Sequence, residues 1–399
     1  MKNELDTFND VLTPLIEKGC SSFLEIIQLA TNYNIAPICY LKNKTGDIEY
    51  LAIGASKVFK NIESIDTDLY SNPIFGAFKF NIKQENNCYF FLPLILLKRE
   101  SKNFSFLLNT TINLGLEYKE DNKEGSKLNT ELPSKADWKI AFEQAIKDFD
   151  DVNDKVVLSK IKSISVDTST NDIKILENLA KKSNDSYLFY LKTESEKTYF
   201  SISPETLYKK IHEKYEIDAI AGTRSYSSIK DLNSKKHELS ISKKDIGEHE
   251  TVCSYIESVL LNAGIDIKRV SERQILTLDN LIHLHSKYQF SSEHINFKQL
   301  INLIHPTPAV CGKNREKSLK TIEKLEPFKR EYFAGGAGII GKDYQDILVN
   351  IRSGEKVYSL MNIFAGAGIV KDSDPDLEWQ EISSKMDNFS FLWKEDESI

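Results

Sequence analysis

Two pairs of carboxylates at helical spacing are the first candidates for chemistry. Asp245 and Glu248 are three residues apart. Glu378 and Glu381 have the same spacing, and each pair falls in a segment whose apolar pattern predicts a helix. Both carboxylates of a pair would point to the same side, because residues three apart share one helix face. Two such helices could hold Mg²⁺ between them, since Mg²⁺ takes oxygen ligands and keeps waters that a substrate can replace.

The same carboxylates also fit a simpler interpretation, two solvated helix faces, because charged residues are mostly exposed. Histidine and cysteine add little. His249 and His283 could be metal ligands, but the sequence holds no HExxH motif, and a single histidine is more typical of a hydrogen-bonded core position. Cys311 has no base beside it in the sequence and is expected to be a small buried residue.

A glycine motif of the form GxGxxG occurs at Gly336, Gly338 and Gly341. A dinucleotide site would require a strand before this motif and a helix after it. The residues that follow, 342–349, indicate a turn into a strand instead. A glycine-rich strand bend near a ligand is therefore the favoured interpretation.

The elements that must position these residues alternate between two periodicities. Apolar residues at helical spacing predict helices over residues 9–30, 138–149, 173–181, 242–261, 297–304 and 317–325, and from about 376. Apolar or alternating runs predict strands over residues 78–97, 155–166, 187–191, 198–202, 344–351 and 357–369. Strand pairs joined by hairpins, with helices grouped between them, favour the α+β class.

Length and composition restrict the class of protein. The chain has 399 residues, 41% of them hydrophobic, which suffices for one large domain or two ordinary ones. The polar segment 119–137 is either a linker between two parts or a long surface loop. The net charge of −7 argues against general nucleic-acid binding, which requires a basic face.

The sequence also predicts no membrane association. Its most apolar stretch, residues 88–97, is too short to span a bilayer, and residues 1–9 do not resemble a secretory signal. The five cysteines are scattered and form no CxxC pair. A reduced, cytoplasmic setting is the expectation.

Eight segments, in the same order, resemble the chorismate-utilising enzyme family, which includes isochorismate synthases, salicylate synthases, anthranilate synthase large components and aminodeoxychorismate synthases. They are residues 155–160, 203–205, 220–224, 248–252, 282–284, 305–310, 351–352 and 364–381. The resemblance implies one α+β domain with antiparallel β-sheets packed face to face, helices outside and the site in a cleft between the sheets. Residues 1–130 would be a divergent N-terminal part of this domain, and residues 131–399 the chorismate-binding catalytic region.

The resemblance also implies a role for each carboxylate. Glu248 and Glu381 match the family's Mg²⁺ ligands, and Asp245 and Glu378 match carboxylates that reach the metal through water. The metal would hold the ring carboxylate of the substrate, which makes physical sense because a cation fixes an anionic substrate and neutralises its charge.

Lys155 and Glu205 match the pair that acts in isochorismate synthases. The lysine activates water as a general base, and the glutamate is the general acid. Water adds at ring C2, the C4 hydroxyl leaves as water, and the double bonds shift without a redox cofactor. Burial would favour the neutral form that each side chain needs.

Further positions match residues that line the chorismate site in the family. They are Gly222, Thr223, His283, Arg352, Gly366, Gly368 and Lys385. The guanidinium fork of Arg352 suits a carboxylate, and His283 is expected to orient the ring hydroxyl or the enolpyruvyl group.

The resemblance is greatest to isochorismate synthases, so the expected activity is Mg²⁺-dependent conversion of chorismate to isochorismate, for menaquinone or siderophore biosynthesis, by a cytoplasmic monomer. Lys155 stands where anthranilate synthases carry glutamine. Ala221 stands where aminodeoxychorismate synthases carry lysine. Salicylate synthase, which adds pyruvate elimination, stays an alternative. A catalytically silent chorismate-binding homologue is disfavoured because Lys155, Glu205, Glu248 and Glu381 are all present.

Overall fold

The computed structural model describes residues 12, 14, 22–100, 103–108, 128–166, 171–193 and 197–393. The start of the helix predicted over residues 9–30 and residues 119–127 of the polar segment 119–137 lie outside these residues. Among the described residues, the helices are all too short or too polar to cross a membrane.

Seventeen strands make up the sheet of the described residues. They are β1 (Ile38–Lys42), β2 (Ile48–Phe59), β3 (Ile74–Phe78), β4 (Cys88–Glu100), β5 (Asn103–Leu108), β6 (Asn129–Leu132), β7 (Lys155–Ser165), β8 (Tyr187–Lys192), β9 (Lys197–Ser203), β10 (Thr206–Ile211), β11 (Lys214–Ser225), β12 (Ile267–Thr277), β13 (Leu281–Ser291), β14 (Gly336–Ile340), β15 (Tyr344–Val349), β16 (Ser353–Val357) and β17 (Leu360–Val370).

Strands that are far apart in the sequence pair with one another. β1 pairs with β2 and with β8, β3 pairs with β4 and with β14, and β7 pairs with β17 along its whole length. Each of the strand pairs formed by the described residues is antiparallel. Strands from before residue 130 therefore share one hydrogen-bonded network with strands from the rest of the chain.

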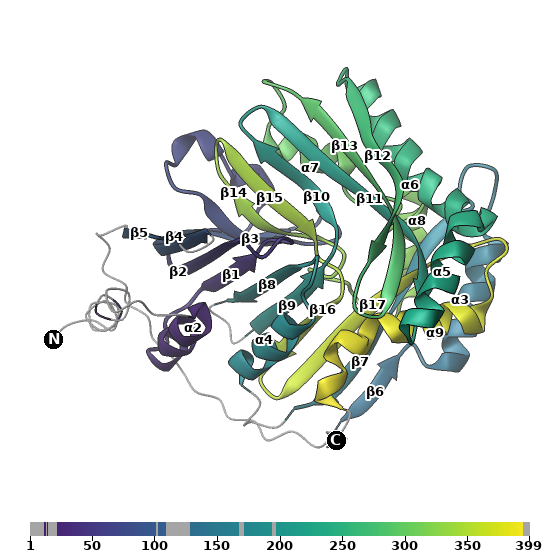
Figure 1. Cartoon of the computed structure of the whole chain (residues 1–399), viewed down its shortest axis with the longest axis horizontal. Helices are drawn as coiled ribbons and strands as arrows, with labels where there is room; N and C mark the ends of the chain where they lie inside the picture. The colour runs from purple at the N-terminus through teal and green to yellow at the C-terminus, as the bar shows by residue number, and fades with distance from the viewer. Residues whose placement is uncertain are drawn as a thin grey trace.

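The sheet folds over so that its inner faces pack against each other (Figure 1). The Tyr187 hydroxyl on β8 donates to Asp346 on β15 at 2.6 Å. Tyr50 on β2 and Tyr344 on β15 have ring centroids 6.2 Å apart. Neither pair belongs to hydrogen-bonded neighbouring strands, so these contacts require the sheet to curve back on itself.

Helices cover the outside of the sheet (Figure 1). They are α2 (Phe23–Asn32), α3 (Lys135–Lys147), α4 (Asp172–Lys181), α5 (Ile229–Ile241), α6 (Lys243–Asn262), α7 (Phe297–Ile304), α8 (Arg315–Leu325) and α9 (Pro375–Met386), with short 3₁₀ turns η1 (Ile62–Ser64), η2 (Thr67–Leu69) and η3 (Asp387–Leu392). α6 packs on β11 and β13, and α9 packs on β17 and β11, so these two helices flank the end of β11.

Local sequence explains where the two flanking helices begin. The Ser242 side chain accepts a hydrogen bond from the backbone N–H of Asp245 and caps α6. Asp374 caps α9 in the same way, and Pro375 occupies the first helical position, where its missing N–H leaves no bond unmade. Each predicted carboxylate pair therefore lies at or near the first turn of its helix.

The predicted helices agree closely with these bounds where the structure describes them. Helix α5 and strands β1, β2, β5, β6, β10 to β13 and β16 were not predicted. β12 illustrates why a strand can escape prediction. Its residues are all partly buried or exposed, several of them are charged, and they form no run of apolar side chains. The glycine motif forms β14, which turns into β15 rather than into a helix, so the strand interpretation is confirmed. Its three glycines do not line the cavity described below.

Candidate active site

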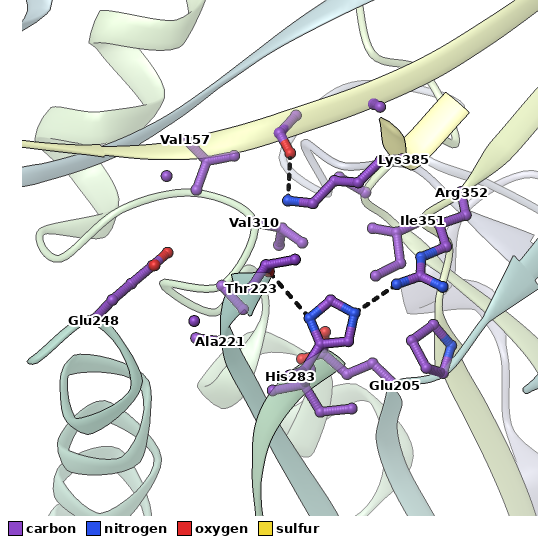
Figure 2. A pocket seen from close by; sticks show the side chains of 18 of the residues that line it. Val157, Glu205, Ala221, Thr223, Glu248, His283, Val310, Ile351, Arg352 and Lys385 are labelled. Atoms are coloured by element: carbon purple, nitrogen blue, oxygen red, sulfur yellow. Dashed lines mark hydrogen bonds between the residues drawn. The ribbon is translucent and has the colours of Figure 1, made fainter. Parts of the chain in front are cut away.

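A cavity is lined by residues of β7, β11, β13, β17, α6 and α9 (Figure 2). Its lining includes the predicted residues Glu205, Gly222, Thr223, Glu248, His283, Arg352, Gly366, Gly368 and Lys385. Figure 2 shows Glu248 on one side of the cavity and His283 with Arg352 on the opposite side. Segments from residue 205 to residue 385 thus converge on one space.

Lys155 lies beside this cavity rather than in its lining. It is 1% exposed, and its Nζ forms an ion pair with Glu248 Oε1 at 3.1 Å. Burial disfavours the charged form of Glu248, but Lys155, with Lys385 and Lys244, outweighs burial and holds the pKa of Glu248 below its usual value. A Cβ at Gly368 would lie 2.4 Å from Glu248 Oε1 and 3.1 Å from Lys155 Cε. Only glycine leaves room for this pair.

Glu205 is a buried carboxyl group with 2% of its surface exposed. Burial raises the pKa of Glu205 to about 8, and the negative charge of Asp218 adds to this effect, whereas Lys44 and Lys155 oppose it. Its Oε1 atom has no hydrogen-bond partner among the described residues. Glu205 is therefore protonated at neutral pH, as a proton donor facing the cavity must be.

His283 links two other predicted residues. Arg352 Nη2 lies 2.6 Å from His283 Nε2, and Thr223 Oγ1 lies 3.0 Å from His283 Nδ1. Arg352 can only donate, so Nε2 accepts and the proton of the neutral ring is on Nδ1, bonded to the Thr223 hydroxyl. Burial, with Arg352 nearby, lowers the pKa of His283 well below its usual value. The ring is thus neutral and suits orientation rather than proton abstraction.

The positions of Thr223 and Arg352 depend on unusual backbone. Gly222 has φ +74° and forms a bulge where β11 pairs with β13, a conformation that favours glycine. The bulge turns Thr223 toward His283. Arg352 itself has φ +48°, which is uncommon for a residue with a side chain. Burial lowers the pKa of Arg352 to about 10, so its guanidinium stays charged at neutral pH.

The other three predicted metal ligands line an adjoining cavity of about 370 Å³, which shares Thr223 with the first. Each is paired with a cation of the protein. Arg224 binds Asp245 at 2.7 Å, Lys244 binds Glu378 at 2.6 Å, and Lys385 binds Glu381 at 2.7 Å. Lys385 also donates to the carbonyl of Gly366 at 2.9 Å.

Within the described residues, no group of three or more His, Cys, Asp or Glu side chains is arranged to hold a metal ion. The donors nevertheless match Mg²⁺ in chemistry, because all of them are carboxylate oxygens. Burial lowers the pKa of Lys244, but Glu378, Glu248 and Glu381 outweigh it and raise the pKa above its usual value. The carboxylates from α6 and α9 thus already stabilise a positive charge in the adjoining cavity.

Several residues at the site were missed by the sequence analysis. Arg330 lines the cavity and is anchored by carbonyls of Val157 and Val310, both at 2.7 Å, and by Glu326. The spacing of Glu326 and Arg330, four residues apart in the sequence, was the available signal. Lys44 was missed because it lies far along the chain from every recognised segment.

The chain resembles known proteins over most of its length. The model of the family described as "Chorismate binding enzyme" matches residues 42–391. The isochorismate synthase EntC of Escherichia coli (strain K12) is 31% identical over 236 residues, 58% of this chain and 60% of its own. The chloroplastic isochorismate synthase of Catharanthus roseus is 29% identical over 272 residues, 66% of this chain and 46% of its own. The match spans less than two thirds of the length of each of these two relatives.

The fold has a close structural counterpart. The structure of MenF, the menaquinone-specific isochorismate synthase from Escherichia coli, superposes with a TM-score of 0.81 at 23% identity, covering 90% of this chain and 89% of that one. This likeness confirms the predicted α+β class with its large antiparallel sheet. The family match covers most of the chain and includes the segments that build the cavity. This protein is a member of the chorismate binding enzyme family.

Proposed function

We propose that this chain converts chorismate to isochorismate in a Mg²⁺-dependent reaction. The observation that carries the proposal is Glu205, a buried carboxyl group that is protonated at neutral pH and lines a cavity beside a buried lysine, Lys155. A general acid and a general base are the two groups that this isomerisation needs. The names of the curated relatives, both isochorismate synthases, support the same reaction.

The two groups divide the proton transfers. Lys155 would take a proton from the water that adds at ring C2, and Glu205 would give its proton to the C4 hydroxyl, which leaves as water. The double bonds shift, and the overall composition of the substrate is unchanged. Lys155 must be neutral when it accepts the proton, whereas its ion pair with Glu248 favours the ammonium form. The reaction therefore requires that this pair be loosened in the working enzyme.

Other side chains would bind and orient the substrate. Arg352, held by His283, presents a guanidinium to one carboxylate of chorismate. Glu248 and Glu381 would hold Mg²⁺ directly, and Asp245 and Glu378 would contact it through water molecules. When bound, the metal supplies positive charge that fixes the ring carboxylate of the substrate and neutralises it.

The test is a product assay. Purified protein is incubated with chorismate and Mg²⁺, with and without a chelator, and the products are separated by reverse-phase chromatography. We expect isochorismate in equilibrium with chorismate, and no conversion with chelator. Salicylate with pyruvate would assign the alternative activity. No product, with chorismate still bound, would refute the roles of Lys155 and Glu205.

A variant pair makes the assay specific. Lys155→Ala should lose most of its turnover yet still bind chorismate. Lys160→Ala is the matched control, because Lys160 is also buried on β7 but is bonded to Glu131 and Ser383, outside the cavity lining. Near-normal turnover in Lys155→Ala would remove this lysine as the base.

The biological setting is part of the proposal. Isochorismate would feed menaquinone or siderophore biosynthesis, and the protein would act as a cytoplasmic monomer. The four described cysteines, Cys39, Cys88, Cys253 and Cys311, are free and buried, which supports a reducing compartment.

A further inference from the structure

A buried charge cluster lies directly behind Glu205. Asp218 on β11 is 3% exposed, and three donors surround its carboxylate. Lys44 Nζ lies 2.5 Å from Oδ2, the backbone N–H of Thr206 lies 3.0 Å from Oδ2, and His285 Nε2 lies 2.8 Å from Oδ1. An ionised carboxylate only accepts, so His285 donates from Nε2.

The cluster holds the peptide on both sides of Glu205. Asp218 binds the N–H of Thr206, the residue after Glu205. Lys44 also donates to the carbonyl of Pro204, the residue before it, at 3.1 Å. The Glu205 carbonyl accepts from the N–H of Val349 at 3.0 Å. The backbone of the proposed acid is therefore fixed at three consecutive residues, two of them through the Lys44–Asp218 ion pair.

Resting on the proposed role of Glu205 as general acid, we propose that Asp218 and Lys44 are positioning residues that fix Glu205 and set its protonation through their opposed charges. Asp218 keeps the carboxyl group of Glu205 protonated, and Lys44 limits this effect. Neither residue lines the cavity, so both act through Glu205 rather than on the substrate.

The charges that face Glu205 support this assignment. Burial is the main cause of its raised pKa, Asp218 raises it further, and Lys44 and Lys155 lower it. Asp218 is the one carboxylate among these, so it is the group whose removal would favour ionisation of Glu205. The remaining charged groups of the cavity lining are Glu248, Arg330, Arg352 and Lys385.

The groups behind the cluster keep Asp218 ionised. Burial opposes ionisation of Asp218, but Lys44 and His285 outweigh burial and hold its pKa well below the usual range. Asp346 on β15 interacts with Lys44, and its own carboxylate accepts from Tyr187. Asp218 therefore carries a fixed negative charge over the pH range in which Glu205 titrates.

Lys44 gives the N-terminal part of the chain a role at the site. It lies between β1 and β2, 174 residues from Asp218 in the sequence. The pairing of β1 with β8 and of β8 with β9 brings this turn against the segment that carries Glu205.

The test compares the pH dependence of kcat in two variants with opposite charge changes. Asp218→Asn keeps the side-chain shape and an acceptor but removes the negative charge. The fall of kcat at alkaline pH, called the alkaline limb below, should therefore begin about one pH unit lower. Lys44→Met removes the positive charge, so the same limb should move up by about one pH unit. The KM for chorismate should change little in both, because neither side chain lines the cavity.

Three controls make the outcome decisive. Lys42→Met removes another partly buried lysine nearby, bonded to Ser183, and should leave the limb in place. The double variant Lys44→Met/Asp218→Asn removes both charges and should return the limb toward its original position, even where one single variant proves too unstable to assay. Unfolding curves of each variant report stability separately.

The proposal is overturned where both single variants leave the limb unmoved, or move it in the same direction. Glu205→Gln separates this result from failure of the proposed function. Normal turnover in Glu205→Gln would refute the role of Glu205 itself. Loss of turnover there, with an unmoved limb in Asp218→Asn, would refute the positioning role alone.

Discussion

Gly368→Ala should reduce the activity of the protein much more than its stability. The added Cβ would lie 2.4 Å from Glu248 Oε1, whereas ordinary contacts begin near 3.4 Å, and 3.1 Å from Lys155 Cε. The carboxylate is the end of a flexible side chain, so it must move by about 1 Å to make room. That movement displaces the Glu248 carboxylate from the position in which it lines the cavity and would hold Mg²⁺.

The two consequences differ in size. Overpacking is expected to destabilise the fold by about 1–3 kcal/mol, at the low end because the crowded atom can move. A misplacement of about 1 Å at a reacting site costs on the order of 100-fold in rate. We therefore expect Gly368→Ala to lose about 100-fold in kcat while its free energy of unfolding falls by about 1 kcal/mol.

The assay is steady-state isochorismate formation beside urea unfolding of the same preparations. Gly247→Ala is the matched control, because Gly247 precedes Glu248 on α6 and an added Cβ there meets nothing within 4 Å. This control should gain up to about 1 kcal/mol of stability without loss of turnover. Undiminished kcat in Gly368→Ala would show that the reaction does not depend on how Lys155 and Glu248 are held.

Three further predictions follow from the site. With Lys155 neutral in the working enzyme, as the proposed reaction requires, kcat should fall about tenfold per pH unit above pH 8, because the pKa of Glu205 is about 8 and only its protonated form donates; a flat profile to pH 10 would contradict this. Arg352→Lys should raise the KM for chorismate by about 10- to 100-fold, since a charged hydrogen bond contributes about 1.5–3 kcal/mol and lysine lacks the fork that contacts both His283 and a carboxylate; an unchanged KM would place the carboxylate elsewhere. Glu381→Gln should weaken Mg²⁺ binding at least about tenfold in calorimetry without substrate, and equal affinity in the variant would remove Glu381 as a ligand.

Sequence reasoning reached much of the fold, because most of its helices and buried strands follow periodic apolar patterns. The strand over residues 155–166, for example, carries valine, leucine and isoleucine, and it forms β7. It missed β12 because a strand with few buried side chains has no such pattern. It also predicted several strand pairs but could not predict that β3 pairs with β14, since pairing at long sequence separation leaves no local signal.

The candidate site, like the fold, could be predicted from the sequence only in part. The spacing of Asp245 and Glu248 placed both on α6, yet only their surroundings show that Glu248 faces the inner cavity and Asp245 the outer one. The resemblance supplied residues within the recognised segments, together with Asp245 and Lys385 just outside them. Lys44 and Asp218 therefore remained unrecognised, because their contact exists only after β1 and β8 have paired.

The long-range pairing of the sheet also governs how the protein reaches its native state. Phe78 of β3 pairs with Gly336 of β14, so a growing chain exposes the apolar edge of β3 until β14 has emerged. Such high contact order slows folding and leaves unpaired strand edges open to aggregation. Lower expression temperature should therefore increase the soluble yield, and truncation before β14 should leave one edge of β3 without its partner strand.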